Sequence, residues 1–470
     1  MAEVKKTYVE EMSRGIYDIK NEVTYKTKLD KGLTEDIVRK ISKEKNEPKW
    51  MLDIRLKAFE LFNKMDNPEW GPDLSEVNMD DLTTYISPDA KMSADWGEVP
   101  DDIKGTFDAL GIPEAERNNS LSGVGAQYDS EVVYHSIKDY LIKQGVVYLD
   151  FESAVKEYED IVKEYFTKCL PPTAHKYLAL HYAVWSGGSF VYVPKGVNVD
   201  IPLQSYFRLN APGAGQFEHT LIVVEEGAYC HFIEGCSAPK YNVVNVHAGA
   251  VELFVKKGAT LRYSTIENWS RNMYNLNSKR AIVEEEGSIE WVSGSFGSKV
   301  SMLYPTSILK GKKARSEFTG ITFAGKDQFL DTGAQAIHLA SDTSSSIISK
   351  SISKDGGVAI YRGLVKIAKD AENCKSTTTC ESLMLDSESR SDTVPVIDIE
   401  NDKVDLGHEA KIGRIDDDII FYMMSRGISE KEAKAMVVRG FAEPIAKELP
   451  LEYAVEMNNL INLELEGTIG

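Results

Sequence analysis

The spacing of hydrophobic and polar residues changes twice along this 470-residue chain. Residues 1–175 are rich in charge and helix formers, and an apolar stripe at helical spacing begins near Leu52. Over residues 176–407 the period switches to two, which predicts β-strands. The helical period returns over residues 408–470. We therefore expect a mainly β protein with a mostly helical N-terminal region and a C-terminal helical domain.

A short phrase that ends in glycine recurs in the β-rich part. Its glycines, at positions 196, 227, 258 and 287, are 31, 31 and 29 residues apart. A fixed period of this size is typical of stacked repeats, and glycine supplies the positive φ of a sharp turn. Both a β-helix and an antiparallel double-sheet barrel fit the short strands, and the near-constant period favours the β-helix. Asp355-Gly356 is the main hairpin candidate.

The flanking regions contain further signals. Residues 150–170 predict one amphipathic helix. Residues 68–119, rich in Pro, Asp and Asn, are interpreted as an extended connection that wraps the surface. Near the C-terminus, Ser429 and Glu432 have the spacing of a capping box.

Composition narrows the class of protein. The formal net charge is −19 and the pI about 5.0, which argues against non-specific nucleic-acid binding. No apolar run reaches the roughly 18 residues of a membrane span, and the N-terminus lacks the apolar core of a signal peptide. Five scattered cysteines without a CxxC pair are typical of a reducing compartment. We expect a cytoplasmic protein without a transmembrane segment.

Few residues indicate chemistry by themselves. Cys236 lies where the strand pattern breaks at Gly and Pro, so it is either an exposed nucleophilic thiol or an inert core cysteine. Cys380 leaves the same two interpretations open. His408 and Glu409 are neighbours, so both would reach one site only if the backbone turned there, and a solvated corner is the simpler interpretation. Nucleotide-binding, zinc-protease and nucleophile-elbow motifs are absent from the sequence.

Several segments taken as strings resemble one family. In chain order these segments are Asn46–Leu56, Ser205–Asn210, Gly215–Glu218, Glu234–Pro239, Tyr263–Trp269, Thr379–Met384, His408–Gly413, Arg426–Glu430 and Glu448–Val455. They are similar to the SufB branch of the SufB/SufD family, the scaffold proteins of the SUF iron–sulfur cluster assembly system. The similarity spans nearly the whole chain, and the segments at Cys236 and Cys380 distinguish it from the SufD branch.

The resemblance implies a fold and a set of site residues. The fold would be a right-handed parallel β-helix between helical ends, with residues 408–470 docking an ATPase. By position, Cys236 matches the family's acceptor of persulfide sulfur. Residues thought to line a passage through the β-helix are matched by Arg208, Asn210, Glu267, Trp269 and Lys279, although Gln is expected where Glu267 stands in some members. The nascent cluster site is matched by Cys380, Glu409 and His408.

The resemblance also implies partners. These are the SufC ATPase, SufD or a second SufB, the cysteine desulfurase SufS with a SufE- or SufU-type sulfur carrier, and apo iron–sulfur proteins or a cluster carrier. The cargo would be a nascent iron–sulfur cluster, and for some members a reduced flavin in the complex. Since the sequence lacks a nucleotide-binding loop, ATP hydrolysis is assigned to SufC, and the chain itself would be a scaffold rather than an enzyme.

The chemistry of these residues is compatible with such roles. A cation near Cys236, such as Arg208 or Lys279, would lower the thiol pKa and stabilise a persulfide anion. A mixed thiolate, carboxylate and imidazole set suits a cluster that must later be transferred. Two alternatives remain open. One is a β-helical polysaccharide lyase or isomerase that acts through the paired carboxylates of the acidic runs at 225–226 and 284–286, and the other is a structural SufD-like subunit.

Overall fold

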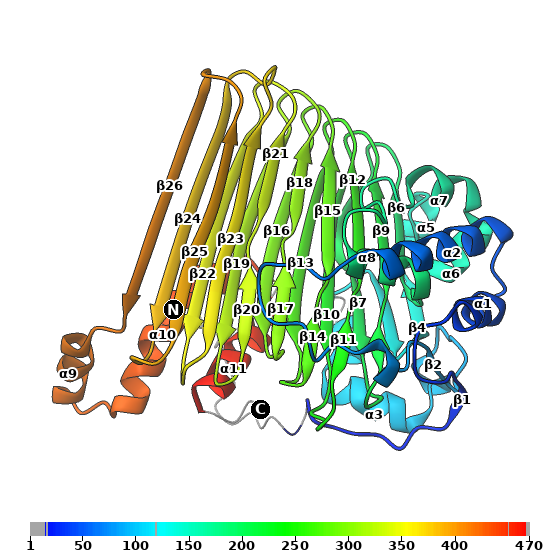
Figure 1. Ribbon diagram of the computed structural model, residues 1–470, viewed down its shortest axis with the longest axis horizontal. Coiled ribbons are helices and arrows are strands. Elements are labelled where there is room, and N and C mark those ends of the chain that lie inside the picture. Colours follow the sequence, from blue (N-terminus) through cyan, green and yellow to red (C-terminus); the bar gives the residue numbers. More distant parts are fainter. Residues whose placement is uncertain (1–14, 16, 118–119, 450, 467–470) are drawn as a thin grey trace.

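The chain folds as a stack of parallel β-rungs with helices at both ends (Figure 1). The computed structural model describes residues 15, 17–117, 120–449 and 451–466. The rungs form two sheets, and successive strands of each sheet pair in parallel at the central rungs. This is the predicted parallel β-helix, and the antiparallel barrel is excluded.

Each rung contributes one long strand to a ten-stranded sheet. In order from one edge, this sheet contains β26 (Val404–Arg414), β24 (Cys374–Met384), β22 (Ser344–Ser353), β19 (Arg315–Ala324), β16 (Ser288–Phe296), β13 (Thr260–Asn268), β10 (Tyr229–Ser237), β7 (Asn198–Arg208), β3 (Gly123–Tyr128) and β4 (Glu131–Ile137).

The second sheet faces the first, and most rungs give it two shorter strands. It contains β5 (Val147–Asp150), β6 (Gly188–Val193), β9 (His219–Val224), β12 (Ala250–Val255), β15 (Ser278–Val283), β18 (Thr306–Leu309), β21 (Gln335–His338), β23 (Val358–Ile367), β20 (Phe329–Thr332), β17 (Val300–Leu303), β14 (Met273–Asn275), β11 (Asn245–His247) and β8 (Gly215–Gln216), with β25 (Arg390–Ile399) on β23.

The corners between rungs explain the glycine period. Gly196, Gly227 and Gly258 have φ values of 70°, 66° and 64°, as the turn prediction requires. At the fourth corner the positive φ falls one residue earlier, on Glu286 at 57°. Asp355 and Gly356 both have positive φ, but the strands they join, β22 and β23, lie in different sheets, so the hairpin prediction is wrong.

The acidic runs suggested for a lyase lie at these corners. Glu226 pairs with Lys195 across neighbouring rungs at 2.8 Å, and Glu285 pairs with Lys257 at 3.1 Å. Both pairs are half exposed, which is the solvated-corner interpretation of acidic runs. These carboxylates therefore join adjacent rungs rather than form a catalytic groove.

The N-terminal region is more mixed than the sequence suggests. β3 and β4 pair with each other antiparallel and extend the ten-stranded sheet through β7. The segment interpreted as an extended connection contains two helices, and the helix expected over residues 150–170 is interrupted at Tyr158, whose φ is −124°. This region contains β1 (Tyr25–Lys28), β2 (Ile86–Pro88), η2 (Met79–Asp81), η3 (Trp96–Glu98), α1 (Glu35–Glu44), α2 (Lys49–Lys64), α3 (Asp101–Ala109), α4 (Ile112–Arg117), α5 (Asp139–Lys143), α6 (Phe151–Glu157) and α7 (Glu159–Tyr165).

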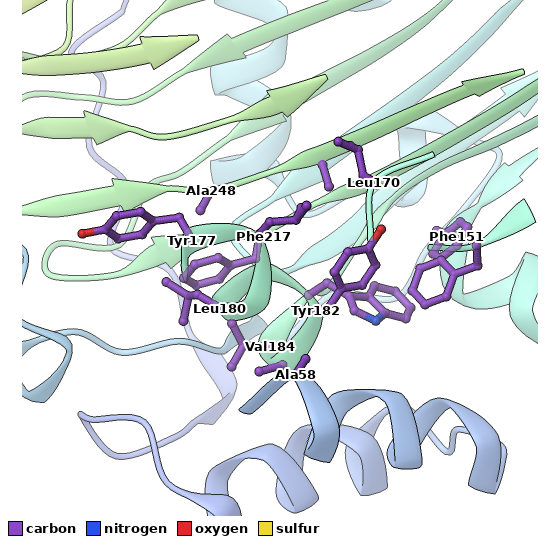
Figure 2. Packing of buried hydrophobic residues seen from close by; sticks show 14 of the residues in the cluster. Ala58, Phe151, Leu170, Tyr177, Leu180, Tyr182, Val184, Phe217 and Ala248 are labelled. Atoms are coloured by element: carbon purple, nitrogen blue, oxygen red, sulfur yellow. The ribbon is translucent and has the colours of Figure 1, made fainter. Parts of the chain in front are cut away.

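One further helix, α8 (Lys176–Val184), joins this region to the β-helix. Figure 2 shows Leu180 and Val184 of α8 between Ala58 of α2 and Phe217, which lies between β8 and β9. All of these side chains are fully or almost fully buried. The helical region is therefore anchored on the sheet by one continuous apolar core.

The C-terminal part contains α9 (Asp417–Ser425), α10 (Glu430–Ala446) and α11 (Leu451–Glu466). Met457 and Leu460 of α11 pack on Ile266 and Ile321, which lie on the outer face of the ten-stranded sheet. Ser429 caps α10, because its hydroxyl accepts from the Glu432 amide at 3.2 Å, as predicted. Among the described residues, no helix is long and apolar enough to cross a membrane.

Two glycines with similar φ give a test of the corner geometry. Gly258, at φ 64°, has open space where a side chain would stand, whereas at Gly297, at φ 76°, a Cβ would lie 1.6 Å from the Trp269 carbonyl oxygen. We expect Gly258→Ala to cost about 1–2 kcal/mol, the cost of a left-handed alanine. Gly297→Ala should cost well over that or prevent folding. Thermal unfolding of both variants checks this, and equal losses would contradict it.

Candidate functional site

The inner face of the ten-stranded sheet changes character along its strands. In the first half of each strand the inward residues are mainly apolar, for example Phe232, Tyr263 and Trp291. In the second half they are small, polar or charged. Because neighbouring strands are in register, the inward residues of the second halves line up in two rows that run across the rungs. One row contains Glu234, Thr265, Ser293, Gly320, Ser349 and Cys380, and the other contains Cys236, Glu267, Ser295, Thr322, Ser351 and Ser382.

Cys236 begins the second row inside regular strand rather than at a break. The prediction of a broken strand is wrong because β10 continues to Ser237, and Gly235 is needed where the Tyr206 ring lies against it. The thiol is 1% exposed, and its Sγ lies 4.0 Å from Glu234 Oε1. Burial and then the nearby Glu234 carboxylate raise the pKa of Cys236 well above its ordinary value. In the isolated chain this group is a buried thiol.

Lys279 reaches into the same interior from β15 in the opposite sheet. Its Nζ lies 2.8 Å from Glu234 Oε1 and 3.6 Å from Glu267 Oε1, and all three side chains are fully buried. Burial alone would lower the pKa of Lys279, but the two carboxylates outweigh it and raise the pKa. Lys279 does lower the pKa of Cys236, as expected, yet burial and the carboxylates have the larger effect.

A chain of hydrogen bonds continues from this cluster into the second sheet. Asn275 donates to Glu267 Oε2 at 2.6 Å and contacts His247 Nδ1 at 2.7 Å. His247 Nε2 lies 2.5 Å from Glu218 Oε1. Burial would lower the pKa of His247, but Glu218 outweighs it, and the net shift is upward. Trp269 packs on this imidazole with ring centroids 4.6 Å apart.

Arg208 and Asn210 lie apart from the cluster. The Arg208 guanidinium donates to Ser237 Oγ at 3.0 Å and to the carbonyl of Ile19 at 2.8 Å. Asn210 donates to the Asn21 carbonyl at 3.1 Å. Both side chains therefore fasten the N-terminal segment to the end of β7. Of the predicted relay residues, Glu267 is the strand neighbour of Cys236, Trp269 shares its buried cluster, and Lys279 pairs with Glu267. Arg208 is instead the strand neighbour of Ser237, and by strand alternation its side chain is on the opposite face from Cys236.

Cys380 lies on the same inner face, five strands from Cys236. At the usual spacing of about 4.8 Å per strand, the two thiols are roughly 24 Å apart. The intervening side chains in both rows are almost fully buried. Ser351 and Ser382 share a hydrogen bond of 2.8 Å, so neighbouring rungs satisfy part of this buried polarity.

The predicted cluster ligands are only partly together. Cys380 Sγ lies 3.6 Å from His408 Nε2 of β26, and burial raises the thiol pKa to about 12. Glu409 is exposed, pairs with Lys411 at 3.1 Å, and follows His408 within an unbroken strand, so it faces away. In the described part of this single chain, no group of three or more His, Cys, Asp and Glu side chains could hold a metal ion.

Sequence reasoning missed several residues of this interior. Glu234 lies within a quoted segment but was not assigned a role, and neither Glu218 nor His247 was singled out. The serines and threonines of the two rows were missed as well. A usable signal exists, because the residues of one row recur about every 27–31 positions, in step with the rungs. The glycine phrase alone marked the corners and not the interior.

Comparisons with known proteins identify the family. Residues 207–441 match the model described as "SUF system FeS cluster assembly, SufBD core domain", and residues 9–205 match that of the "SufBD protein N-terminal region". The "Iron-sulfur cluster assembly protein SufB" of Bacillus subtilis (strain 168) is 54% identical over 441 residues, which are 94% of this chain and 95% of that protein.

Staphylococcal relatives give the same result. An "Iron-sulfur cluster assembly SufBD family protein" of Staphylococcus aureus (strain MRSA252) and another of Staphylococcus haemolyticus (strain JCSC1435) are each 53% identical over 441 residues, again 94% of this chain and 95% of theirs. The chain belongs to the SufBD family, and its role is in iron–sulfur cluster assembly. The resemblance seen in the motifs is confirmed.

The electrostatics at Cys236 predict how its alkylation depends on pH. Glu234→Gln removes a negative charge beside Sγ, so the midpoint of iodoacetamide labelling should move to lower pH; Lys279→Met should move it to higher pH. Peptide mass spectrometry measures this directly. Cys230, whose pKa is raised to about 12 by burial, is an internal control and should not respond. Equal shifts at Cys230, or reversed signs at Cys236, would contradict the assignment.

Proposed function

We propose that this SufBD-family chain is a scaffold that accepts persulfide sulfur at Cys236, conducts it through the β-helix, and builds a nascent iron–sulfur cluster at Cys380. The main support is geometric. Both thiols lie on the inner face of one sheet, and the two rows of small, polar or charged residues join their neighbourhoods. An apolar core lines the rest of this face, so the rows mark the polar route between the sheets.

Sulfur transfer at Cys236 is a thiol–persulfide exchange. The Cys236 sulfur attacks the terminal sulfur of the carrier's persulfide, the carrier's S–S bond breaks, and a new persulfide forms on Cys236 while the carrier thiol is released. The exchange is redox-neutral. Glu234, 4.0 Å from Sγ, is placed to take the thiol proton, and Lys279 is placed to stabilise the resulting anion. Because Cys236 is buried, docking of the carrier has to open the site.

The cargo site at Cys380 is incomplete in one chain. Cys380 and His408 offer one thiolate and one imidazole, and a cluster requires more ligands. Both lie beside the open edge of the β-helix, where β26 and β25 each have one side that pairs with no other strand among the described residues. Val396, Ile397 and Ile412 on these strands are 45–49% exposed. A second β-helical subunit, SufD or another copy, would cover this surface and supply further ligands.

The remaining partners are proposed from the family and from the surface. α9 exposes Ile419, Phe421 and Tyr422 at 49%, 71% and 60%, an apolar face suited to the SufC ATPase. Since the sequence lacks a nucleotide-binding loop, ATP hydrolysis would belong to SufC. The sulfur source would be the desulfurase SufS through a SufE- or SufU-type carrier. We place the process in the cytoplasm.

Cysteine variants separate sulfur uptake from cluster building. With a persulfidated carrier bearing labelled sulfur, Cys236→Ser should lose uptake, whereas Cys380→Ser should keep uptake and lose cluster absorbance after anaerobic addition of iron. Cys230→Ser and Cys374→Ser are matched controls, because both are buried thiols outside the polar rows. Uptake that persists in Cys236→Ser, or cluster yield unchanged in Cys380→Ser, would contradict the assignment.

The open edge gives a second test. Ile412→Asp places a charge on β26 and should abolish association with the second β-helical subunit, because burying an unpaired charge at an interface is unfavourable. Cluster yield should fall while sulfur uptake at Cys236 stays normal. Leu339→Asp is the matched control, since Leu339 is 46% exposed but lies away from the edge. Sedimentation measures association, and an unchanged complex in Ile412→Asp would remove this edge as the interface.

A further inference from the structure

A cleft of about 530 Å³ lies between the N-terminal region and the second sheet. One wall is the segment 65–70 that follows α2, and the other includes the first turn of α8. Its floor is formed by the residues around the start of β15 and by Tyr304. The volume is typical of a small-molecule site. Figure 2 shows Tyr177, one of the lining residues, on α8.

Asn277 on the floor of the cleft has no protein partner. The side chain is 4% exposed, and neither its amide nitrogen nor its amide oxygen has a hydrogen-bond partner among the described residues. A buried polar group left unpaired costs about 1–3 kcal/mol, so such groups are rare without a reason. A ligand that brings one donor and one acceptor would satisfy this amide.

Two cations border the same cleft without a carboxylate partner. Neither Arg280 nor Lys176 has an ion pair among the described residues, although the chain's net charge is −19. Arg280 donates to the Cys169 carbonyl at 3.1 Å, and its buried Nε has no partner. Lys176 opens α8, whose N-terminus carries the positive end of the helix dipole. His175 adds no charge at neutral pH, because burial and then Arg280 lower its pKa to about 4. Asp66 also lines the cleft, and Glu252 is the strand neighbour of Arg280, but neither forms an ion pair with Arg280 or Lys176 among the described residues. The two cations therefore remain available to an anion.

The outer part of the cleft is apolar and aromatic. Trp70 is 48% exposed and packs 5.7 Å from the Tyr304 ring, and Met65 and Met302 lie in the same wall. Exposed tryptophan beside polarisable methionines is a surface on which a flat apolar group binds well. The cleft thus presents a planar surface, an amide and a pair of cations.

We propose that this cleft binds a small organic carboxylate that also carries an amide and a flat apolar group, the chemistry of an N-acylated amino acid. The carboxylate lies against Arg280 and Lys176, the amide pairs with Asn277, and the apolar group covers Trp70. Arg280 and Lys279 of β15 both line the cleft, and the Nζ of Lys279 pairs with Glu234 in the interior. The cleft therefore borders the proposed sulfur route at Lys279, whereas Asn277 and Lys176 have no part in the proposed sulfur transfer.

Calorimetric titration of the full chain with N-benzoylglycine tests this. Its neutral relative N-benzoylglycinamide lacks the charge, and benzoate lacks the amide. We expect N-benzoylglycine to bind roughly tenfold more tightly than either, since the glycinamide loses a charge-assisted hydrogen bond and benzoate loses the hydrogen bonds of the amide. Asn277→Ala and Lys176→Met should each weaken binding by about the same factor. The exposed Asn242→Ala and Lys369→Met are matched controls and should bind normally.

Stability of the free protein separates a ligand site from a structural role. Because the Asn277 amide has no protein partner, Asn277→Ala should not lower the midpoint of thermal unfolding. Asn277→Asp, which keeps the shape, should fold and repel the carboxylate. Equal binding of the charged and neutral probes, absence of binding, or a large loss of stability in Asn277→Ala would overturn the proposal. If the cleft holds only water, none of the three probes should bind.

Discussion

In-register parallel stacking is the constraint on which the rest of the structure depends. Because each strand pairs with the equivalent strand of the next rung, a residue at one inward position lies directly beside its equivalents in the neighbouring rungs. Apolar residues occupy the inward positions in the first half of each strand, and small or polar residues occupy those in the second half. An apolar core and a polar route therefore lie side by side between the sheets. The outer face compensates, since α11 covers Ile266 and Ile321 there. Because the rungs are in register, the same kind of side chain at one position of every rung forms a continuous row along the stack.

Buried charge within that path argues for a role other than stability. Removing Lys279, Glu234 and Glu267 from water is costly, and a buried ion pair generally contributes little more than a well-packed apolar group. The protein nevertheless surrounds these groups with Tyr263 and Asn275, which hydrogen-bond to the carboxylates. Such an arrangement stabilises charge at a fixed point, which is what the proposed transfer of sulfur through an anionic state would require.

The sequence predicted the features that depend on neighbouring residues of the chain. It did not predict those that depend on contacts between different rungs. The period of the corners was visible, because glycine has a local conformational reason, and even there Glu286 takes the positive φ in place of Gly287. The strand break predicted at Cys236 was wrong. Glycine is required at position 235 because the ring of Tyr206 on the neighbouring strand occupies the space of a side chain, and the strand continues through it. The resemblance identified Lys279 as a site residue. Its position relative to Cys236 depends on how the two sheets face each other, and the spacing of residues along the chain does not reveal that arrangement. The separation of Glu409 from His408 followed directly from strand alternation.

The two ends of the stack differ in a way that would give the proposed sulfur route a direction. At one end β3 turns back into antiparallel β4, and α1, α2, α6 and α7 gather there, so that end of the ten-stranded sheet does not offer another parallel rung (Figure 1). At the other end, within the part of the chain that the structure describes, the outer edges of β26 and β25 are unpaired and carry exposed isoleucines. Proteins generally avoid such an edge unless it is covered. Cys380 lies one strand inside that edge and Cys236 lies six strands inside it. A second subunit at the open edge would therefore meet the proposed cluster site and not contact the proposed sulfur acceptor, which would separate the two proposed reactions in space.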